Sequence, residues 1–389
     1  MAFEYQKLTE PDAIRLIILQ PSEDLESPLH CELITTTLTH RQDDLLEHYT
    51  ALSYVWGDTS KIITIMVDGH TFPITTSLDT ALRHLRDTSR TRKVWTDAIC
   101  INQDDLEKRN RQVRQMASVY SIAQHTVIWI GEGTPETDQF FKNLKLLSSY
   151  RQTGRQMMSS DENASNESTR MSASRDILSR QRFKRVWILQ ELVRSLDPWV
   201  QCGKLCVKWD DVKTSVTEFP VSQPGENRIQ VLHDMAKLHS EYPSGRFRRR
   251  LEQDSQDPRL VAQNLLSLLT SRRGLGVADP RDMLFAHVGL LGNVQLDESL
   301  LRLIEIDYEK EQDLVFFDLA RFLTESFQDY RILTFLENRH PTTSSNTTSW
   351  IPDWTVTSPP QYLAISSALQ LEDTTPGKYF PPNPQFLCF

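Results

Sequence analysis

The chain has 389 residues, of which 39% are hydrophobic and 24% are charged, and its formal net charge is −9. This composition is typical of a globular protein with one elaborated domain or two domains. The acidic balance argues against sequence-independent nucleic-acid binding, which requires a basic face. No apolar run approaches the roughly 18 residues of a membrane span, and the N-terminus lacks a secretory signal. Since the five cysteines are sparse and scattered, we expect reduced thiols and a cytoplasmic protein.

The first 48 residues are predicted to be a lead-in that contains strands. Ile14–Leu19 is an apolar run, and His30–Leu38 has an alternating pattern, which together favour two strands. These strands either edge the central sheet or form a small lobe of their own.

The next segment predicts a strand, a hairpin and the start of a helix. Tyr49–Gly57 alternates apolar and small residues and ends in glycine, which is typical of a strand. Ile62–Val67 and Thr71–Ile74 flank Asp68-Gly69, the dipeptide that most strongly indicates a hairpin. Ser77 is then predicted to be the N-cap of a helix.

A strand–helix–strand unit follows and organises the rest of the fold. Val94–Ile99 is predicted to be a buried strand, and His125–Ile130 a second one. Asp104 or Asp105 is placed to cap the helix between them, because a short carboxylate accepts from the free N–H groups of the first turn. Such a unit implies parallel pairing with a right-handed crossover.

Beyond this unit the pattern changes. Arg151–Arg175 is rich in Ser, Asn, Glu and Arg, which predicts a mobile insertion. Ile177–Ser195 is predicted to be one strong helix, and Trp199–Trp209 a hairpin. The remaining chain, residues 196–389, is expected to form a mainly helical extension.

Three segments carry a family resemblance. YTALSYVWGD (49–58), the strand–helix–strand unit (94–131) and FKRVWILQELVRS (183–195) resemble, in order, the three blocks of the fungal heterokaryon incompatibility (HET) domain. The resemblance places this domain at residues 49–195. It implies a cytoplasmic fungal protein of non-self recognition that leads to programmed cell death, with an unknown incompatibility partner. The segments at 279–292, 306–309 and 349–354 resemble those that often follow the domain.

A second, shorter resemblance is to TIR domains. WILQEL (187–192) is similar to the TIR signature, with Ile188 in place of its cysteine. The resemblance implies an α/β fold with a TIR-like or flavodoxin-like parallel sheet flanked by helices. It also implies an NAD glycohydrolase that self-associates, with NAD as substrate rather than resident cofactor and Glu191 as the catalytic residue.

The surroundings of Glu191 are compatible with that role. Glu191 follows Trp187 by four residues, so on a helix the carboxylate and the indole share a face. A partly desolvated carboxylate can stabilise the oxocarbenium-like state in which nicotinamide leaves ribose. The alternative is that Glu191 is a structural charge paired with Arg194 or with a neighbouring strand. The residues leave both interpretations open.

The ends of the first two parallel strands supply the predicted ligand-binding residues, because ligands of open parallel sheets bind beyond the carboxyl ends of the strands. At least one of the two aromatics Tyr54 and Trp56 is expected to pack in the core. Asp97 is as well suited to fixing the turn that follows it as to binding a ligand. The complete predicted set is Tyr54, Trp56, Gly57, Asp58, Asp97, Asn102, Gln103 and Trp187 for ligand binding, Glu191 for catalysis and no metal ligand.

The sequence is compatible with two other classes of function. Cys100 is a candidate nucleophile with His84 or His125 as its base, although a small buried thiol is the commoner outcome. The second class is a non-enzymatic protein-interaction module, in which the same surfaces assemble partners. Cys202 and Cys206 lack the further ligands that a zinc site needs.

Overall fold

The computed structural model describes residues 3–43, 48–153, 172, 176–177, 179–217, 235–239, 256–292, 294–336 and 350–356. The polar insertion predicted at 151–175 lies outside the described residues apart from 151–153 and 172.

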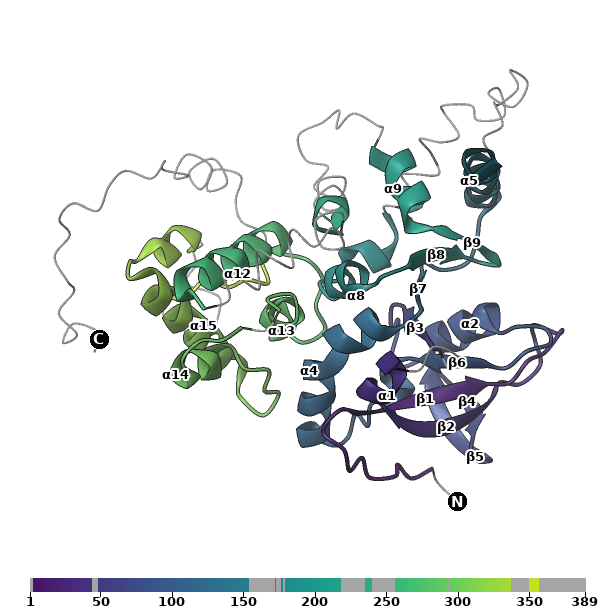
Figure 1. Cartoon of the computed structure of the whole chain (residues 1–389), viewed down its shortest axis with the longest axis horizontal. Helices are drawn as coiled ribbons and strands as arrows, with labels where there is room; N and C mark the ends of the chain where they lie inside the picture. Colours follow the sequence, from purple (N-terminus) through teal and green to yellow (C-terminus); the bar gives the residue numbers. More distant parts are fainter. Residues whose placement is uncertain are drawn as a thin grey trace.

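A mixed sheet of nine strands forms the centre of the described chain (Figure 1), in the spatial order β5-β4-β2-β1-β6-β3-β7-β8-β9. The strands are β1 Ala13–Leu19, β2 His30–Thr37, β3 Thr50–Ser53, β4 Ile62–Val67, β5 His70–Thr75, β6 Arg92–Trp95, β7 His125–Trp129, β8 Pro198–Cys202 and β9 Leu205–Lys208. With helices on the sheet, the predicted α/β class is confirmed.

The parallel core of the sheet is β6-β3-β7-β8. The chain leaves β3 for β6 on one side and then returns past β3 to β7, which is the strand order of flavodoxin-like sheets. Right-handed connections that run in opposite directions put their helices on opposite faces. Helix α2 (Thr76–Leu85) and helix α4 (Leu106–Ile122) accordingly lie on different sides of the strands in Figure 1.

Antiparallel strands extend this core at both edges. β1 pairs with β6 and with β2, so the N-terminal strands belong to the central sheet rather than to a separate lobe. The hairpin predicted at Asp68-Gly69 is confirmed as β4–β5, with both turn residues at positive φ. The hairpin β8–β9 is also confirmed, and it continues the sheet beyond residue 195.

Four local predictions are corrected by the structure. The strand expected at Tyr49–Gly57 is limited to β3, which ends at Ser53. The strand expected at Val94–Ile99 ends at Trp95, and residues 97–100 form the short helix α3 (Asp97–Cys100). The N-cap of α2 is Thr75, whose hydroxyl accepts from the N–H of Leu78 at 3.4 Å, and not Ser77.

The helix expected at Ile177–Ser195 is divided into the 3₁₀ turn η1 (Gln181–Lys184) and helix α8 (Ile188–Arg194). By contrast, one of the two predicted caps of α4 is confirmed, because the Asp105 carboxylate accepts from the N–H of Lys108 at 3.1 Å.

The remaining described helices either cover the sheet or pack farther out. They are α1 Leu38–Asp43, α5 Pro135–Thr153, α9 Trp209–Thr217, α12 Pro258–Arg272, α13 Asp282–Val288, α14 Glu298–Leu301 and α15 Gln312–Phe327, with the 3₁₀ turns η2 Arg302–Ile304 and η3 Arg331–Phe335. Helices α12 to α15 lie beyond α4 and α8, on the side away from the sheet (Figure 1).

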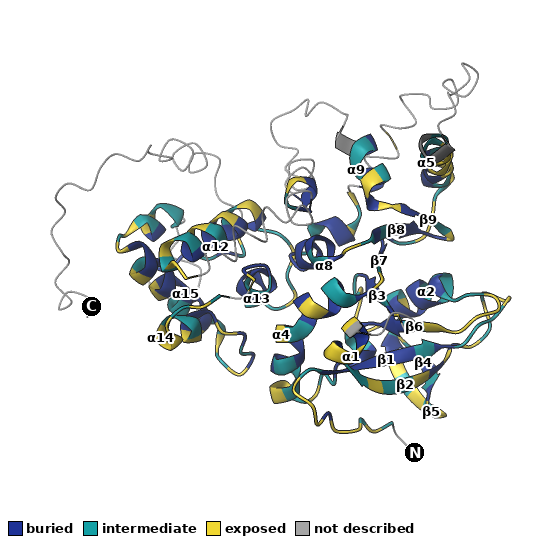
Figure 2. Ribbon diagram, viewed as in Figure 1, coloured by how far each residue is buried: buried dark blue, intermediate teal, exposed yellow. Residues whose placement is uncertain are grey.

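The C-terminal helices share one apolar core with the sheet. Figure 2 shows buried residues on both sides of α4 and α8, and the cluster around Trp95 and Leu52 continues without a break to Phe285 and Leu319. Polar contacts fix the segment before α15 on α4. The Asn110 side chain accepts from the N–H of Tyr308 at 2.9 Å.

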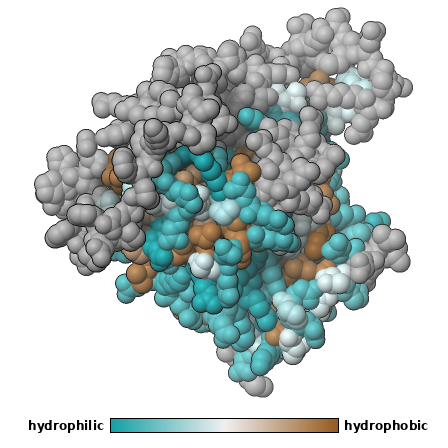
Figure 3. All heavy atoms as spheres, turned by 60° about the vertical axis from the view of Figure 1, so that its left-hand side comes forward, coloured by the Kyte–Doolittle hydropathy of each residue, from teal (hydrophilic) through white to brown (hydrophobic). Residues whose placement is uncertain are grey.

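The described surface is mostly hydrophilic on the face shown in Figure 3, with smaller hydrophobic areas near its centre. Among the described residues, no helix combines the length and the apolar character needed to cross a membrane.

Candidate functional site

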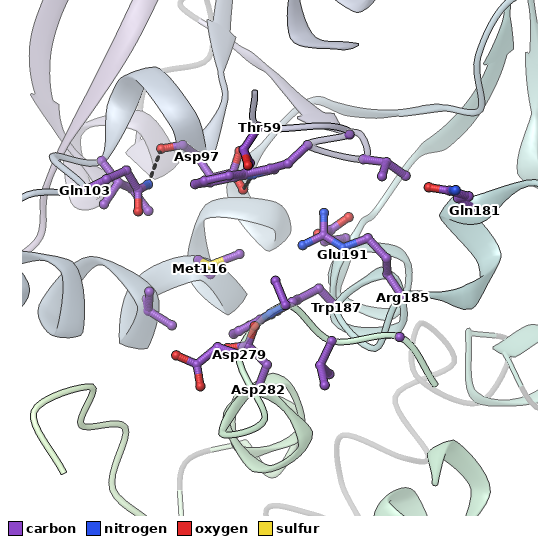
Figure 4. Close-up of a pocket in the computed structure, with 18 of the residues that line it drawn as sticks. Thr59, Asp97, Gln103, Met116, Gln181, Arg185, Trp187, Glu191, Asp279 and Asp282 are labelled. Atoms are coloured by element: carbon purple, nitrogen blue, oxygen red, sulfur yellow. Dashed lines mark hydrogen bonds between the residues drawn. The ribbon is translucent and has the colours of Figure 1, made fainter. Parts of the chain in front are cut away.

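A cavity of about 480 Å³ opens at the carboxyl ends of β3 and β6 (Figure 4). The loops that follow these strands form one wall, α4 and α8 form the floor, and residues of the segment 276–308 close the opposite side. Strand ends leave backbone groups and loop side chains free for a ligand, which is why open parallel sheets bind there. The volume of the cavity is in the range of small-molecule sites.

Six of the predicted site residues are brought together at this cavity. Its lining includes Trp56, Gly57, Asp97, Gln103, Trp187 and Glu191. The indole N–H of Trp56 donates to Asp97 Oδ2 at 2.7 Å, which ties the loop after β3 to the loop after β6. The Gln103 side chain donates to the Asp97 carbonyl at 3.0 Å (Figure 4). Asp97 therefore organises both loops as well as lining the cavity.

The other three predicted residues lie elsewhere. Tyr54 is 3% exposed and packs in the core, where burial raises the pKa of its phenol well above the usual value. Asp58 is exposed, and its carboxylate accepts from the N–H of Ser60 at 3.0 Å. Asn102 accepts from the N–H of Asp104 at 3.2 Å. Of the two strand aromatics, Tyr54 is thus the core residue and Trp56 the one at the cavity.

Gly57 shapes the loop that carries Trp56, and it gives a testable prediction. Its φ is +73°, and a Cβ there would lie 3.0 Å from the Cβ of Ser77. Gly69 has a similar φ of +75° with open space around it. We expect Gly57→Ala to lower the free energy of unfolding by about 2 kcal/mol and Gly69→Ala by about 1 kcal/mol, as measured by urea unfolding. Equal losses would show that the contact with Ser77 is unimportant.

Glu191 lies at the wall of the cavity but is not a free carboxylate. It is 5% exposed, forms an ion pair with Arg182, and accepts a hydrogen bond from the Ser53 hydroxyl. Arg182 is carried by η1, is 1% exposed, and also donates to the Tyr54 carbonyl at 2.5 Å. Burial lowers the pKa of Arg182 to about 9.

This pairing bears on both interpretations of Glu191 from the sequence. The charge of Glu191 is neutralised inside the protein by Arg182. This agrees with the interpretation of Glu191 as a structural charge, although the paired cation is Arg182 and not Arg194. Arg194, the partner named from the sequence, instead donates from Nε to the carbonyl of Gly289 at 2.9 Å. In this arrangement Glu191 cannot act as an open anion, and its catalytic role stays a prediction that requires the ion pair to separate.

Sequence reasoning missed the far side of the cavity. Asp279, Asp282 and Tyr308 line it, together with the cations Arg109 and Arg185. The resemblance at 279–292 and 306–309 marked these segments without indicating that they meet the strand ends, because contacts over 200 residues apart leave no local pattern.

The structure contradicts a Cys100 nucleophile. Cys100 is fully buried, and burial raises the pKa of its thiol to about 12. Both candidate bases have other partners. The centre of the His84 ring lies 4.9 Å from that of the Trp129 ring, and His125 Nδ1 lies 2.7 Å from Asp197 Oδ2. Within the described ranges, no group of three or more His, Cys, Asp or Glu residues is placed to hold a metal ion.

Comparison with known proteins places this geometry in context. Residues 49–191 match the family model described as heterokaryon incompatibility protein (HET). Over 152 residues the chain is 36% identical to heterokaryon incompatibility protein 6, OR allele, of Neurospora crassa, an alignment that covers 36% of this chain and 22% of that protein. The chain thus spans about a fifth of the length of this relative. No solved structure matches the chain.

Proposed function

We propose that this chain, whose residues 49–191 match the heterokaryon incompatibility (HET) family model, acts in fungal non-self recognition, as an effector whose activation leads to programmed cell death. The identity with the Neurospora crassa incompatibility protein supports this role. The matched residues include the loops after β3 and β6, all of α4 and Glu191, so the family region carries most of the cavity.

The output we propose is cleavage of NAD in this cavity. The observation that carries it is that Glu191 and Trp187 line the same cavity as the strand-end residues Trp56 and Asp97. In the reaction, the bond between ribose C1 and the nicotinamide nitrogen breaks, and its electron pair leaves with nicotinamide. Water then adds at C1 and releases a proton. A carboxylate beneath the ribose stabilises the cationic transition state.

For this reaction the described arrangement is a resting one, because the ion pair of Glu191 has to separate before the carboxylate can act. Arg182 belongs to η1 and Glu191 to α8, so a shift of η1 separates the two charges without moving the helix. Self-association of the domain is one event that would supply such a shift.

A second candidate is a non-enzymatic interaction module of the same pathway. The buried pair between Glu191 and Arg182 favours it, because a carboxylate held this way serves the fold rather than chemistry. In this case the cavity and the surfaces around it would recognise the unknown incompatibility partner.

The two candidates predict different behaviour of Glu191→Gln. The test is the rate of NAD loss in fungal cells that express the wild type or the variant, measured while the incompatibility reaction is triggered. NAD cleavage predicts loss of NAD with the wild type and a rate at least about 100-fold lower with Glu191→Gln, because the charge that stabilises the transition state is gone. Equal loss with both proteins would remove Glu191 from catalysis.

The matched control is Arg182→Gln, which breaks the same ion pair but keeps the carboxylate. Retained NAD loss with Arg182→Gln, at equal protein level, separates catalysis from stability. An incompatibility reaction that proceeds with unchanged NAD in all three strains would favour the interaction module.

A further inference from the structure

Two tryptophans at the cavity each lie beside a carboxylate. Trp56 donates to Asp97, and both belong to the region matched by the family. Trp187 lies beside Asp282, which belongs to the segment after that region (Figure 4). Figure 4 shows Asp97 on one side of the cavity and Asp282 on the other, near Trp187. An indole whose N–H is bonded presents its ring faces and edge to a planar ligand in a fixed orientation.

Asp282 is itself positioned by Tyr308. The Tyr308 hydroxyl donates to Asp282 Oδ1 at 2.6 Å, and both residues are buried. The guanidinium of Arg109, on α4, lies 3.9 Å from the centre of the Tyr308 ring. Asn110, which is also on α4, accepts a hydrogen bond from the backbone N–H of Tyr308. Asp282 and Tyr308 therefore form a fixed part of the cavity wall.

The charges around the cavity leave a cationic balance. Two of its acids are neutralised from behind the wall: Glu191 by Arg182, and Asp279 by Arg281 at 2.7 Å. Three cations line the cavity, namely Arg109, Lys184 and Arg185. Among the described residues, no carboxylate lies within ion-pair distance of these three. Asp97 and Asp282 remain as the two other acids of the lining, and Asp282 is buried and accepts a hydrogen bond from Tyr308.

We propose that the cavity is a composite nucleotide site, in which a planar base or nicotinamide ring lies against Trp56 and Trp187, and a phosphate group is bound by Arg109, Lys184 and Arg185. Asp97 accepts from a ribose hydroxyl. Asp282 and Tyr308 are positioning residues that fix the Trp187 ring, so the chain beyond the family match is half of the site. This site rests on the proposed function, in which NAD enters the same cavity, and adds the cations that bind a phosphate group and the residues that position the far wall.

The test is calorimetric titration of the full chain with AMP, NAD and inorganic pyrophosphate. We expect Tyr308→Phe and Asp282→Asn to weaken binding of AMP and NAD by about tenfold, because both disturb the buried hydrogen bond from Tyr308 to Asp282 that fixes the wall beside Trp187. Pyrophosphate, which depends on the cations alone, should bind all three proteins equally. A general structural defect would weaken all ligands together. Tyr330→Phe is the matched control, since Tyr330 is 48% exposed.

A second measurement tests the route through Trp187. In a Trp187→Phe background, which lacks the indole N–H, Asp282→Asn should weaken AMP binding no further. Unchanged AMP affinity in Tyr308→Phe and Asp282→Asn, or no AMP binding by the wild type, would overturn the inference. Weakened AMP binding without any NAD cleavage would support the composite site while contradicting the proposed reaction. NAD cleavage that is unchanged in both variants would support the proposed reaction while contradicting the composite site.

Discussion

Glu191→Ala is expected to lower the free energy of unfolding by about 3–5 kcal/mol, because it leaves the buried guanidinium of Arg182 without its anion. Both side chains are almost fully buried, and the Ser53 hydroxyl and the Tyr54 carbonyl complete the network. Burial already disfavours the charge of Arg182, as its lowered pKa of about 9 shows. Urea unfolding of the purified proteins at pH 7 measures the loss.

The double variant Arg182→Met with Glu191→Leu is the critical comparison. Replacing both charges with apolar side chains of similar size removes the desolvation cost along with the attraction, so its stability should lie within about 1–2 kcal/mol of the wild type. Glu325→Ala is the control for an exposed pair, since its partner Arg321 is 46% exposed, and a loss below about 0.5 kcal/mol is expected. If Glu191→Ala behaved like Glu325→Ala, the buried pair would not support the fold.

The sequence predicts the parts of this fold that depend on neighbouring residues. The hairpin at Asp68-Gly69 was found because a left-handed turn selects these two residue types. Strands β3 and β7 were found because a buried parallel strand is a short apolar run between turn residues. The cap Asp105 follows from the same local chemistry.

Local patterns fail where a nearby alternative has the same chemistry. Thr75 and Ser77 both suit an N-cap, and the choice is made by tertiary structure: the Ser77 hydroxyl donates to the Val55 carbonyl in the loop after β3. Asp97 was assigned to a strand because it follows an apolar run. It instead begins α3, where its carboxylate can reach both Trp56 and the N–H of Ala98.

The candidate site was predictable only on one side. Trp56, Asp97 and Trp187 follow from the rule for parallel strand ends and from the family resemblance. Arg182 was overlooked because it lies nine residues before Glu191, in a segment predicted to be one continuous helix. On such a helix the two side chains would not meet, and only the break after η1 turns Arg182 toward Glu191.

The second large effect concerns acid stability and His287 on α13. His287 is fully buried, its ring hydrogen-bonds through Nδ1 to the Met283 carbonyl at 2.7 Å, and burial lowers its pKa to about 4, with the Arg272 charge acting in the same direction. The unfolded chain has a histidine pKa near 6.5. Between these values the unfolded state binds more protons than the folded state, so stability falls as the pH falls from about 6.5 to about 4.

We expect this histidine to remove about 3 kcal/mol of stability over that range, because each pKa unit corresponds to about 1.4 kcal/mol. His287→Leu cannot titrate, so its stability relative to the wild type should rise by this amount from pH 7 to pH 4, as measured by urea unfolding at each pH. The exposed His40 provides the control His40→Gln, whose curve should run parallel to the wild type. A His287→Leu curve that also runs parallel would show that the buried imidazole is protonated in the folded protein, and that the core around α13 admits a charge.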